Sequence, residues 1–174
     1  MNGFLNPAEV LKQLKLKKTM TAADFGCGAG GWVLPLARIL EEGRVYGIDI
    51  LEEPLSALRS KAKTDKLYNV VSLRADIEKG TTLLNGSCDV VLMTNLLFQA
   101  SNKKGILAEG KRVLKSNGKI LVVDWKKEAP FGPEQGRITA EDAKELAKET
   151  GLETEKEFEA SSSHWALILS PVEN

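Results

Sequence analysis

Short apolar runs alternate with amphipathic stretches along the chain, and this alternation predicts strands separated by helices. The run at 88–93 is apolar almost throughout, which is typical of a strand that is buried on both faces of a parallel sheet. Strands are expected at 20–25, 45–50, 69–74, 88–93, 119–124, 152–159 and 164–169. Helices are expected after Asn6, around 34–40, from Pro54 to Ala62, at 101–115 and from Thr139 to Gly151.

Capping signals support several of these helix ends. Asn6 followed by Pro7 is typical of a helix N-terminus, and Thr139 with Asp142 has the spacing of a capping box. Asn117 and Gly118 form a common C-terminal pair, so the helix at 101–115 is expected to end there.

Strand–helix alternation predicts an α/β fold, a doubly wound Rossmann-like sandwich with helices on both faces of a mostly parallel sheet. Only the serines at 161–163 join the last two strands. Because this connection is too short for a parallel crossover, the last of the seven strands is expected to run antiparallel. No linker or repeat divides the chain, so we expect one domain over 1–174, with an N-terminal helix in 1–18 and the core in 19–174.

The composition is that of a globular protein without bulk charge. Hydrophobic residues make up 43% and charged residues 28%, while 24 Lys and Arg balance 24 Asp and Glu. A net charge of zero argues against a protein that holds nucleic acid or anionic membrane by overall charge, although a local basic patch remains possible.

Cysteine, histidine and the N-terminal sequence restrict the class of protein further. Cys27 and Cys88 form no metal or disulfide pattern, and the single histidine, His164, excludes a multi-histidine metal site. The N-terminus lacks the basic and apolar regions of a signal peptide, and no apolar run reaches the ~20 residues that span a bilayer. We therefore expect a cytoplasmic protein with no membrane span and no metal site.

A glycine-rich segment directly follows the first expected strand. Residues 24–31 read Asp-Phe-Gly-Cys-Gly-Ala-Gly-Gly, and glycines at such a turn let a ligand approach the backbone where a Cβ would collide. Gly26, Gly28 and Gly31 also fit the dinucleotide fingerprint, with Asp49 at the spacing of its acidic residue. This motif alone is compatible with a nicotinamide-dependent enzyme.

Three features favour a different cofactor. Asp24 stands directly before the glycines, and a further acid, Asp76, ends the third expected strand, where it could meet an adenine amino group. The chain also ends after one sheet, without the substrate domain that a dehydrogenase normally adds.

With these features, the sequence resembles the class I S-adenosylmethionine-dependent methyltransferases. It is most similar to their small type-11 members, which are similar to quinone-biosynthesis enzymes. The stretches that carry the resemblance, in the order and spacing of the family, are 22–31, 45–49, 73–76, 88–93 and 112–119. The resemblance implies a seven-stranded sheet with an antiparallel last strand, S-adenosylmethionine as cofactor and methyl transfer as reaction.

The resemblance also implies roles for individual positions. Asp24 and the glycine backbone would hold the methionine part, with Asp24 near its ammonium group, and Asp49 would accept hydrogen bonds from both ribose hydroxyls. Asp76 would contact the adenine amino group, while Asn95 and Leu96 would face the methyl group and the acceptor. The implied cofactor contacts are Asp24, Gly26, Cys27, Gly28, Gly30, Asp49, Ile50, Asp76, Ile77, Asn95 and Leu96.

Structural explanations for the same residues stay open at this point. The glycines could form a turn and nothing more, Asp49 could be a solvated strand end, and Asp76 could cap a helix near Lys79. Cys27 is expected to be a small packing residue rather than a nucleophile, because no base stands near it in the sequence.

The acceptor side is less clearly marked. The segment at 94–98 lacks the acid/Asn-Pro-Pro-aromatic motif of relatives that methylate nucleobase or glutamine amines, which argues against an N-methylating nucleic-acid enzyme. Candidate substrate contacts after the fifth strand are Trp125, Lys126 and Arg137, for stacking, for orienting an anion and for clamping a carboxylate. Each has a structural alternative: a lid over the core, a solvated lysine and an ion pair.

His164 and Asn95 are the candidate catalytic residues. The antiparallel last strand begins at the edge where the parallel strands end, so His164 is expected at the active edge. A neutral imidazole there could take a proton from an acceptor hydroxyl or amine, or could equally be a hydrogen-bonded strand end.

The leading hypothesis is therefore methyl transfer from S-adenosylmethionine to a small molecule, by a monomer or homodimer. One alternative is an RNA 2′-O-methyltransferase, since 43–49 and the final His-x-Ala-Leu also resemble fibrillarin, although the acid and lysine of that family are only partly matched. Another is a non-catalytic methyltransferase-like subunit of a larger assembly.

Overall fold

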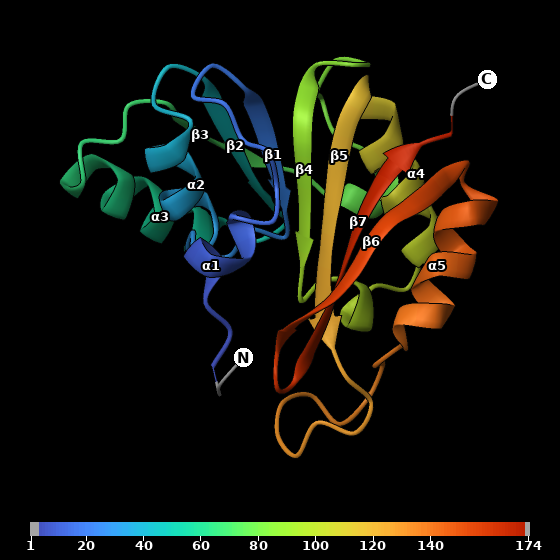
Figure 1. Ribbon diagram of the computed structural model, residues 1–174. Coiled ribbons are helices and arrows are strands. Elements are labelled where there is room, and N and C mark those ends of the chain that lie inside the picture. The colour runs from blue at the N-terminus through green and yellow to red at the C-terminus, as the bar shows by residue number, and fades with distance from the viewer. Residues whose placement is uncertain (1–3, 173–174) are drawn as a thin grey trace.

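The computed structural model describes residues 4–172 and contains one seven-stranded sheet (Figure 1). The strands are β1 Thr21–Phe25, β2 Arg44–Asp49, β3 Val70–Arg74, β4 Cys88–Thr94, β5 Leu114–Trp125, β6 Leu152–Ser161 and β7 His164–Pro171. Their order in the sheet is β3-β2-β1-β4-β5-β7-β6. The chain thus begins in the middle of the sheet, builds one half outward and then returns to build the other.

The strand directions confirm the expected mixed sheet. β1 pairs in parallel with β2 and β4, and the pairs β2–β3 and β4–β5 are also parallel. β7 runs antiparallel to both β5 and β6, so the last strand is the antiparallel one.

Helices cover both faces of the sheet, as predicted. The helices are α1 Pro7–Leu11, α2 Val33–Ile39, α3 Glu52–Thr64, α4 Lys103–Val113 and α5 Ala140–Glu149, with short 3-10 turns η1 Ile77–Lys79 and η2 Leu97–Gln99. One core cluster joins the sheet to α4 and α5, and the other joins it to α1, α2 and α3.

Two local predictions about helix ends are confirmed. The Asn6 side chain accepts a hydrogen bond from the Ala8 amide at 3.1 Å, and Thr139 with Asp142 forms a complete capping box. Pro35 lies in the first turn of α2, where its missing N–H costs no helical hydrogen bond.

The predicted end of the helix at 101–115 is wrong. α4 ends at Val113, and Asn117 and Gly118 lie inside β5. The pairing of β4 with β5 shifts register in this stretch, and a Cβ at Gly118 would lie 2.9 Å from the Asp89 carbonyl oxygen. Gly118 therefore allows a close approach of two strands, and it does not end a helix.

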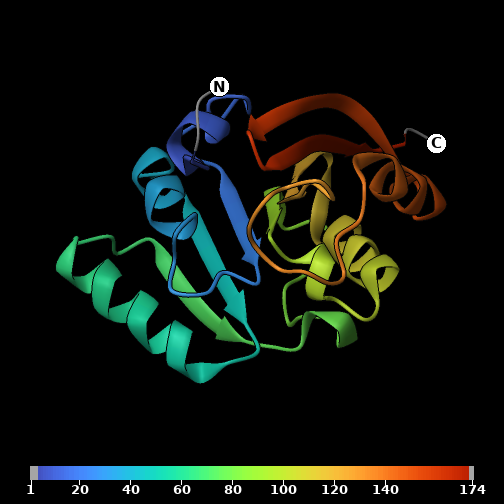
Figure 2. The same cartoon turned by 90° about the horizontal axis from the view of Figure 1, so that it is seen from below.

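The carboxyl ends of β1 to β5 and the β6–β7 turn meet at one edge of the sheet, which is the lower edge in Figure 1. Figure 2 looks onto this edge, and the orange loop between β5 and α5 crosses in front of it. In open α/β sheets ligands bind at this edge. Across the described part of the chain, no helix has the length and apolar character needed to cross a membrane.

The prediction of one domain over 1–174 stays a prediction, and residues 1–3 and 173–174 of that range lie outside the described part. Within the expected N-terminal segment 1–18, the helix itself is short and spans only α1.

Candidate active site at the carboxyl edge of the sheet

A pocket of about 300 Å³ opens where β2 and β3 end, and we call it the β2–β3 pocket. Its lining residues are Gly26, Asp49, Ile50, Leu51, Pro54, Ala75, Asp76, Ile77, Glu78, Leu96, Gln99, Ala100 and Ile106. The pocket brings together residues from the ends of four strands that are distant in the sequence. Six of the expected cofactor contacts are among them: Gly26, Asp49, Ile50, Asp76, Ile77 and Leu96.

Asp49 ties the end of β2 to the glycine-rich loop. Its Oδ2 accepts a hydrogen bond from the Gly28 amide at 2.9 Å, and its Oδ1 accepts one from the Leu51 amide at 3.0 Å. A carboxylate has about four acceptor sites, so Asp49 is held in place and still has lone pairs for a ligand.

Asp76 both lines the pocket and caps η1, so the structural explanation for this residue is also realised. Its Oδ1 accepts a hydrogen bond from the Glu78 amide at 3.2 Å, and its Oδ2 forms an ion pair with Lys79 at 2.8 Å. The hydrogen bond from Lys79 is the main reason why the pKa of Asp76 lies below its usual value. Ile77, beside it, is buried, whereas Ile50 is 53% exposed and offers a free apolar surface.

The three glycines of the loop differ in what surrounds them. Gly26, Gly28 and Gly30 all have positive φ, at 72°, 51° and 90°. A Cβ at Gly28 would meet nothing within 4 Å, whereas a Cβ at Gly30 would lie 2.5 Å from Leu58 Cδ1. Gly30 is thus needed for packing against α3, and it is the Gly28 backbone that faces open space.

Cys27 is a packing residue in this structure. Its side chain is buried, and its Sγ would lie 3.1 Å from a Cβ placed at Gly47, so it fills space beside β2. Burial is the main reason why the pKa of the Cys27 thiol lies far above its usual range, with the charges of Asp24 and Asp49 adding to it. A thiol that resists ionisation is a poor nucleophile.

Asp24 is completely buried, and neither of its carboxylate oxygens has a hydrogen-bond partner. Burial, with a smaller effect of the neighbouring Asp49, raises the pKa of Asp24 well above its usual value. A buried carboxyl group without partners is costly to the fold, and it is retained where a ligand provides the partner.

Asn95 follows β4 directly and has the left-handed backbone conformation, with φ of 50°. Its amide donates a hydrogen bond to the Val123 carbonyl at 2.8 Å, and its own carbonyl accepts one from Gln99 Nε2 at 3.0 Å. The backbone is therefore held on both sides, while the side-chain Oδ1 is buried and unpartnered. Leu96, the next residue, lies over Gly26, with its Cδ1 2.9 Å from the position of a Cβ there.

Asp124 at the end of β5 holds the turn that follows Asn95. It is buried, and its Oδ2 accepts a hydrogen bond from the Phe98 amide at 3.1 Å, while its Oδ1 accepts one from the Trp125 amide at 2.8 Å. Burial raises the pKa of Asp124 to about 6, and these backbone donors partly oppose that shift.

His164 is buried beside Trp125, with 4.1 Å between the ring centroids. Its Nδ1 shares a hydrogen bond of 2.9 Å with the Ser161 hydroxyl, and its Nε2 is buried without a partner. Burial, followed by the charges of Arg137 and Lys126, lowers the pKa of His164 to about 4. The imidazole is therefore neutral near pH 7, and the free Nε2 is the atom left to contact a ligand.

Arg137 forms its hydrogen bonds within the loop between β5 and α5. The guanidinium donates hydrogen bonds to five loop carbonyls, those of Lys126, Lys127, Ala129, Phe131 and Pro133. This arrangement favours a structural role over the expected carboxylate clamp. Lys126, also expected to contact substrate, forms an ion pair of 2.5 Å with Glu159.

Trp125 forms the wall between this loop and the sheet. The Phe131 ring meets it edge-on, with 6.0 Å between centroids, and Gly132 packs so closely that a Cβ would lie 2.6 Å from the indole. One side of Trp125 is thus covered by the loop and another by His164.

Buried polar atoms without partners gather at this one edge. Within residues 4–172, such side-chain atoms belong to Asp24, Asn95, Ser163 and His164. These residues stand at the carboxyl ends of β1 and β4 and at the start of β7. Since nearly all buried polar groups in folded proteins are paired, this concentration is typical of a site where a ligand supplies the partners.

A family model described as a methyltransferase domain matches residues 16–166. The chain belongs to this methyltransferase family. The match runs from before β1 to the first residues of β7 and includes every residue of the edge described above.

Individual relatives agree with this assignment. The methyltransferase domain is 28% identical to a SAM-dependent methyltransferase from Aquifex aeolicus, whose crystal structure superposes with a TM-score of 0.88 over 95% of this chain and 89% of that one. It is 27% identical to a demethylmenaquinone methyltransferase from Geobacillus stearothermophilus, over 71% of this chain and 53% of that protein. A shorter match, 40% identical over 73 residues, links it to a tRNA (guanine-N(7)-)-methyltransferase from Neurospora crassa, over 37% of this chain and 25% of that protein.

The chain therefore spans about half the length of the demethylmenaquinone methyltransferases that it matches. The family assignment covers the cofactor, S-adenosylmethionine, and the residues of this methyltransferase domain fit that cofactor. The unpartnered Asp24 carboxyl can receive an ammonium group, the open side of Gly28 leaves room for a ligand against the backbone, and Asp49 retains free acceptor sites. No group of three or more His, Cys, Asp or Glu residues within 4–172 is arranged to hold a metal ion.

Sequence reasoning missed the residues that hold the others in place. Gln99 fixes the Asn95 carbonyl, Asp124 fixes the turn after it, and Ser161 fixes the His164 ring. Asp124 had a signal, because it is a lone acid at the end of an apolar strand. Gln99 and Ser161 had none, because their roles depend on turn geometry that no motif specifies.

Proposed function

We propose that the protein transfers a methyl group from S-adenosylmethionine to a small-molecule acceptor. The observation that carries this proposal is the row of buried, unpartnered polar atoms on Asp24, Asn95, Ser163 and His164, next to the open β2–β3 pocket. The pocket suits the adenosine part of the cofactor, and the row of polar atoms suits its amino-acid part and the acceptor.

The cofactor supplies a methyl group bonded to a positively charged sulfur. Asp24 binds the ammonium group, Asp49 accepts hydrogen bonds from the ribose hydroxyls, and Ile50 and Ile77 contact the faces of the adenine ring. Asp76 accepts a hydrogen bond from the adenine amino group through a carboxylate that Lys79 also contacts. Gly28 lets the ligand pass close to the backbone.

Asn95 and His164 act on the acceptor. The side-chain Oδ1 of Asn95 would accept a hydrogen bond from an O–H or N–H of the acceptor and so hold the acceptor's nucleophilic atom, which is a ring carbon in a demethylated quinol, towards the methyl group. The proton that the methyl group replaces would leave to solvent, and S-adenosylhomocysteine would be released. His164, which is neutral with a pKa of about 4, accepts a second hydrogen bond at Nε2 but is a weak base. The catalytic contribution is therefore mainly orientation and exclusion of water, with Trp125 closing the site.

A quinol precursor is the first acceptor to test, because the relatives that cover most of the chain are demethylmenaquinone methyltransferases. The partial match to a tRNA methyltransferase supports a nucleic-acid acceptor as second candidate. The zero net charge of the chain favours a small-molecule acceptor over RNA, since RNA binding depends on neutralising phosphates.

The test begins with thermal unfolding in the presence of S-adenosylhomocysteine, S-adenosylmethionine or NAD. A ligand at ~100 times its Kd adds about 2.7 kcal/mol to stability, which shifts the Tm of a domain of this size by several degrees. We expect a shift with the two sulfur nucleotides only, and a shift with NAD alone would disprove the assignment.

Labelled S-adenosylmethionine is then offered with a demethylated naphthoquinol, with bulk tRNA or with no acceptor. Label in the quinol supports the proposal, and label in tRNA replaces it by the second candidate. Cofactor binding without transfer to any acceptor in a broad library points to the third hypothesis, a methyltransferase-like subunit that needs a partner.

A further inference from the structure

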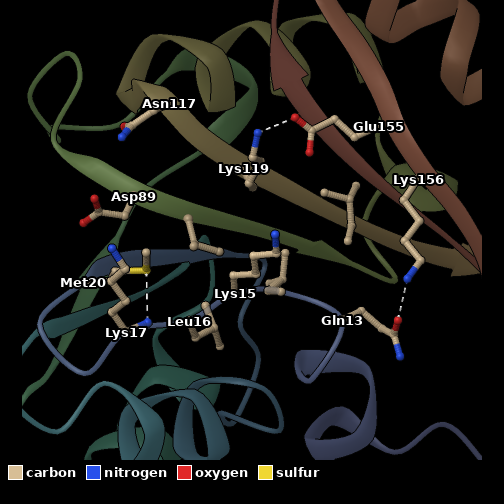
Figure 3. A pocket seen from close by; sticks show the side chains of 13 residues that line it. Gln13, Lys15, Leu16, Lys17, Met20, Asp89, Asn117, Lys119, Glu155 and Lys156 are labelled. Carbon is tan, nitrogen blue, oxygen red and sulfur yellow. Dashed lines mark hydrogen bonds and ion pairs between the residues drawn. The ribbon is translucent and has the colours of Figure 1, made fainter.

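A second cavity, larger than the β2–β3 pocket, lies at the opposite edge of the sheet, and we call it the basal groove. Its volume is about 610 Å³, which lies within the range of small-molecule sites. Figure 3 shows it between the segment that precedes β1 and the amino ends of β4 and β5, with β6 alongside. The basal groove is lined by Gln13, Leu14, Lys15, Leu16, Lys17, Met20, Asp89, Val90, Asn117, Lys119, Glu155, Lys156 and Ile168.

The groove exists because this face of the sheet is only partly covered. α2 and α3 pack over β1, β2 and β3, whereas on the same face only the short α1 and the residues after it reach the other half of the sheet (Figure 1). The floor that remains is apolar, with Leu14, Val90 and Ile168 at its base and Leu16 and Met20 beside them. An apolar floor favours the apolar part of a ligand.

The rim of the groove is basic, and its carboxylates are already occupied. Asp89 accepts hydrogen bonds from the Thr21 amide and from Lys115, each at 2.8 Å. Glu155 forms an ion pair with Lys119. Neither acid is therefore free to balance the other lysines of the rim.

Three lysines remain. Lys156 donates to the neutral amide of Gln13 at 2.8 Å, and among the described residues neither it nor Lys17 forms an ion pair with a carboxylate. Lys15 forms no ion pair among the described residues. The hydrogen bond from Lys119 is the main reason why the pKa of Glu155 lies below its usual value, and the charge of Lys15 adds a smaller effect. In Figure 3, Lys15 and Lys17 stand on one side of the groove and Lys119 and Lys156 on the other. The basic groups thus face one space from several elements of a protein whose net charge is zero.

We propose that the basal groove binds a small organic anion with an apolar body, at a site separate from the cofactor. The apolar part lies on Leu14, Val90 and Ile168, and the carboxylate, sulfonate or phosphate lies among Lys15, Lys17 and Lys156. The concave shape and the volume favour a small ligand over a peptide, which would need a longer contact surface.

The test compares two fluorescent probes with nearly the same apolar body. 8-Anilinonaphthalene-1-sulfonate carries one negative charge, and N-phenyl-1-naphthylamine carries none. Binding is measured on the folded full chain at low and high salt, with and without saturating S-adenosylhomocysteine. We expect the sulfonate to bind about tenfold more tightly than the neutral probe, to weaken as salt rises, and to bind equally in both nucleotide conditions.

Charge-reversal variants locate the site. Lys15→Glu and Lys156→Glu, each made as a single variant, are expected to weaken sulfonate binding, and the two combined are expected to weaken it about tenfold or more, with the neutral probe changed less. Each single variant changes the net charge by the same amount as the control below. Lys63→Glu is the matched control, because Lys63 is an exposed lysine of α3 outside the groove, and it should leave binding unchanged. Melting temperatures of the variants show that the fold is intact.

Several results would overturn the proposal. Equal affinity for both probes would show that charge plays no part, and equal weakening by Lys63→Glu would show that only overall charge matters. Displacement of the sulfonate by S-adenosylhomocysteine would place the probe in the cofactor site instead. Failure of S-adenosylhomocysteine to bind would contradict the proposed function alone, because the lysine variants still test the groove.

Discussion

The carboxyl edge has two halves, the β2–β3 pocket and the stretch from β1 to β7. Their polar side chains differ in exposure and in hydrogen bonding. In the β2–β3 pocket the carboxylates are accessible and already hydrogen-bonded, as Asp49 is to two backbone amides and Asp76 is to an amide and a lysine. From β1 to β7 the edge contains buried polar atoms without hydrogen-bond partners, such as both carboxylate oxygens of Asp24 and the Nε2 of His164.

This difference indicates what each half contributes when a ligand binds. The open half is in place before binding, because its carboxylates keep their positions through bonds to the protein. The buried half costs stability until a ligand supplies the missing partners. We therefore expect substitutions in the buried half to weaken ligand binding without lowering stability. Substitutions in the open half should lower both.

The largest effect is expected for Gly28→Ala, at the junction of the two halves. A Cβ at Gly28 meets no protein atom, so the fold loses only the ~1–2 kcal/mol that an alanine costs in the left-handed backbone conformation. The added methyl group should, however, occupy the space left for the cofactor. We expect loss of measurable nucleotide binding by calorimetry.

Gly30→Ala is the matched control, because its Cβ would clash with Leu58 at 2.5 Å. It should lower the melting temperature more than Gly28→Ala does. If Gly28→Ala binds the nucleotide normally, the backbone at Gly28 does not face the ligand.

The second prediction concerns the buried carboxyl. Asp24→Asn removes a group whose charged form is disfavoured by burial, so the protein without ligand should be as stable as the parent or more stable. Binding should weaken by at least about 100-fold, because breaking a buried charged pair costs about 3–5 kcal/mol and each 1.4 kcal/mol is a factor of ten in affinity. Thermal unfolding and calorimetric titration measure the two effects on the same sample. A variant that loses stability and binds normally would show that Asp24 serves the fold.

The fold could be predicted from sequence because its signals are local. Apolar runs, the Thr139 capping box and the tight turn after β6 each fix one element, and topology rules then order them. Asn117 and Gly118 misled the prediction because the same dipeptide serves a helix end or a close strand contact. Only the pairing of β4 with β5 distinguishes the two cases.

The candidate site was predictable only in part. Residues that a motif places after a strand, such as Asp49 and Asp76, gather in the β2–β3 pocket. The structural role of Arg137 could not be predicted in this way. Its guanidinium donates hydrogen bonds to five loop carbonyls, and the sequence does not show that these carbonyls lie around one side chain. The roles of both groups in binding stay predictions until tested.

The third prediction returns to the open half. Asp49→Ala removes the acceptor of the Gly28 and Leu51 amides as well as that of the ribose hydroxyls. Because hydrogen bonds to charged groups contribute about 1.5–3 kcal/mol, we expect roughly tenfold weaker binding or more, together with a lower melting temperature. Asp49→Asn should retain part of both. Unchanged affinity would show that the ribose is held elsewhere.

The fourth prediction is that cofactor affinity and stability depend on pH because of a group in the buried half. Since the pKa of Asp24 is raised, the free protein keeps the proton of this carboxyl to a higher pH than the unfolded chain does, and the resulting contribution to stability is present at low pH and lost as pH rises through that pKa. A bound ammonium group favours the ionised form, so affinity should rise with pH, by at most tenfold per unit, as the pH approaches the raised pKa of Asp24 from below. Titrations in buffers of different ionisation enthalpy should reveal proton release, and Asp24→Asn should abolish both effects.

The smallest effect is expected for Cys27→Ala, although Cys27 lies inside the glycine-rich loop. Its thiol is buried, its pKa lies far above the usual range, and its Sγ packs beside β2. The variant should therefore keep nucleotide affinity and methyl transfer within about twofold, because no chemistry is assigned to the sulfur. It should lose about 1 kcal/mol of stability from the small cavity, which chemical denaturation can measure. Loss of methyl transfer with nucleotide binding intact would show that the thiol takes part in the reaction. The site would then contain a reactive group between two halves whose other residues only bind and orient the ligands.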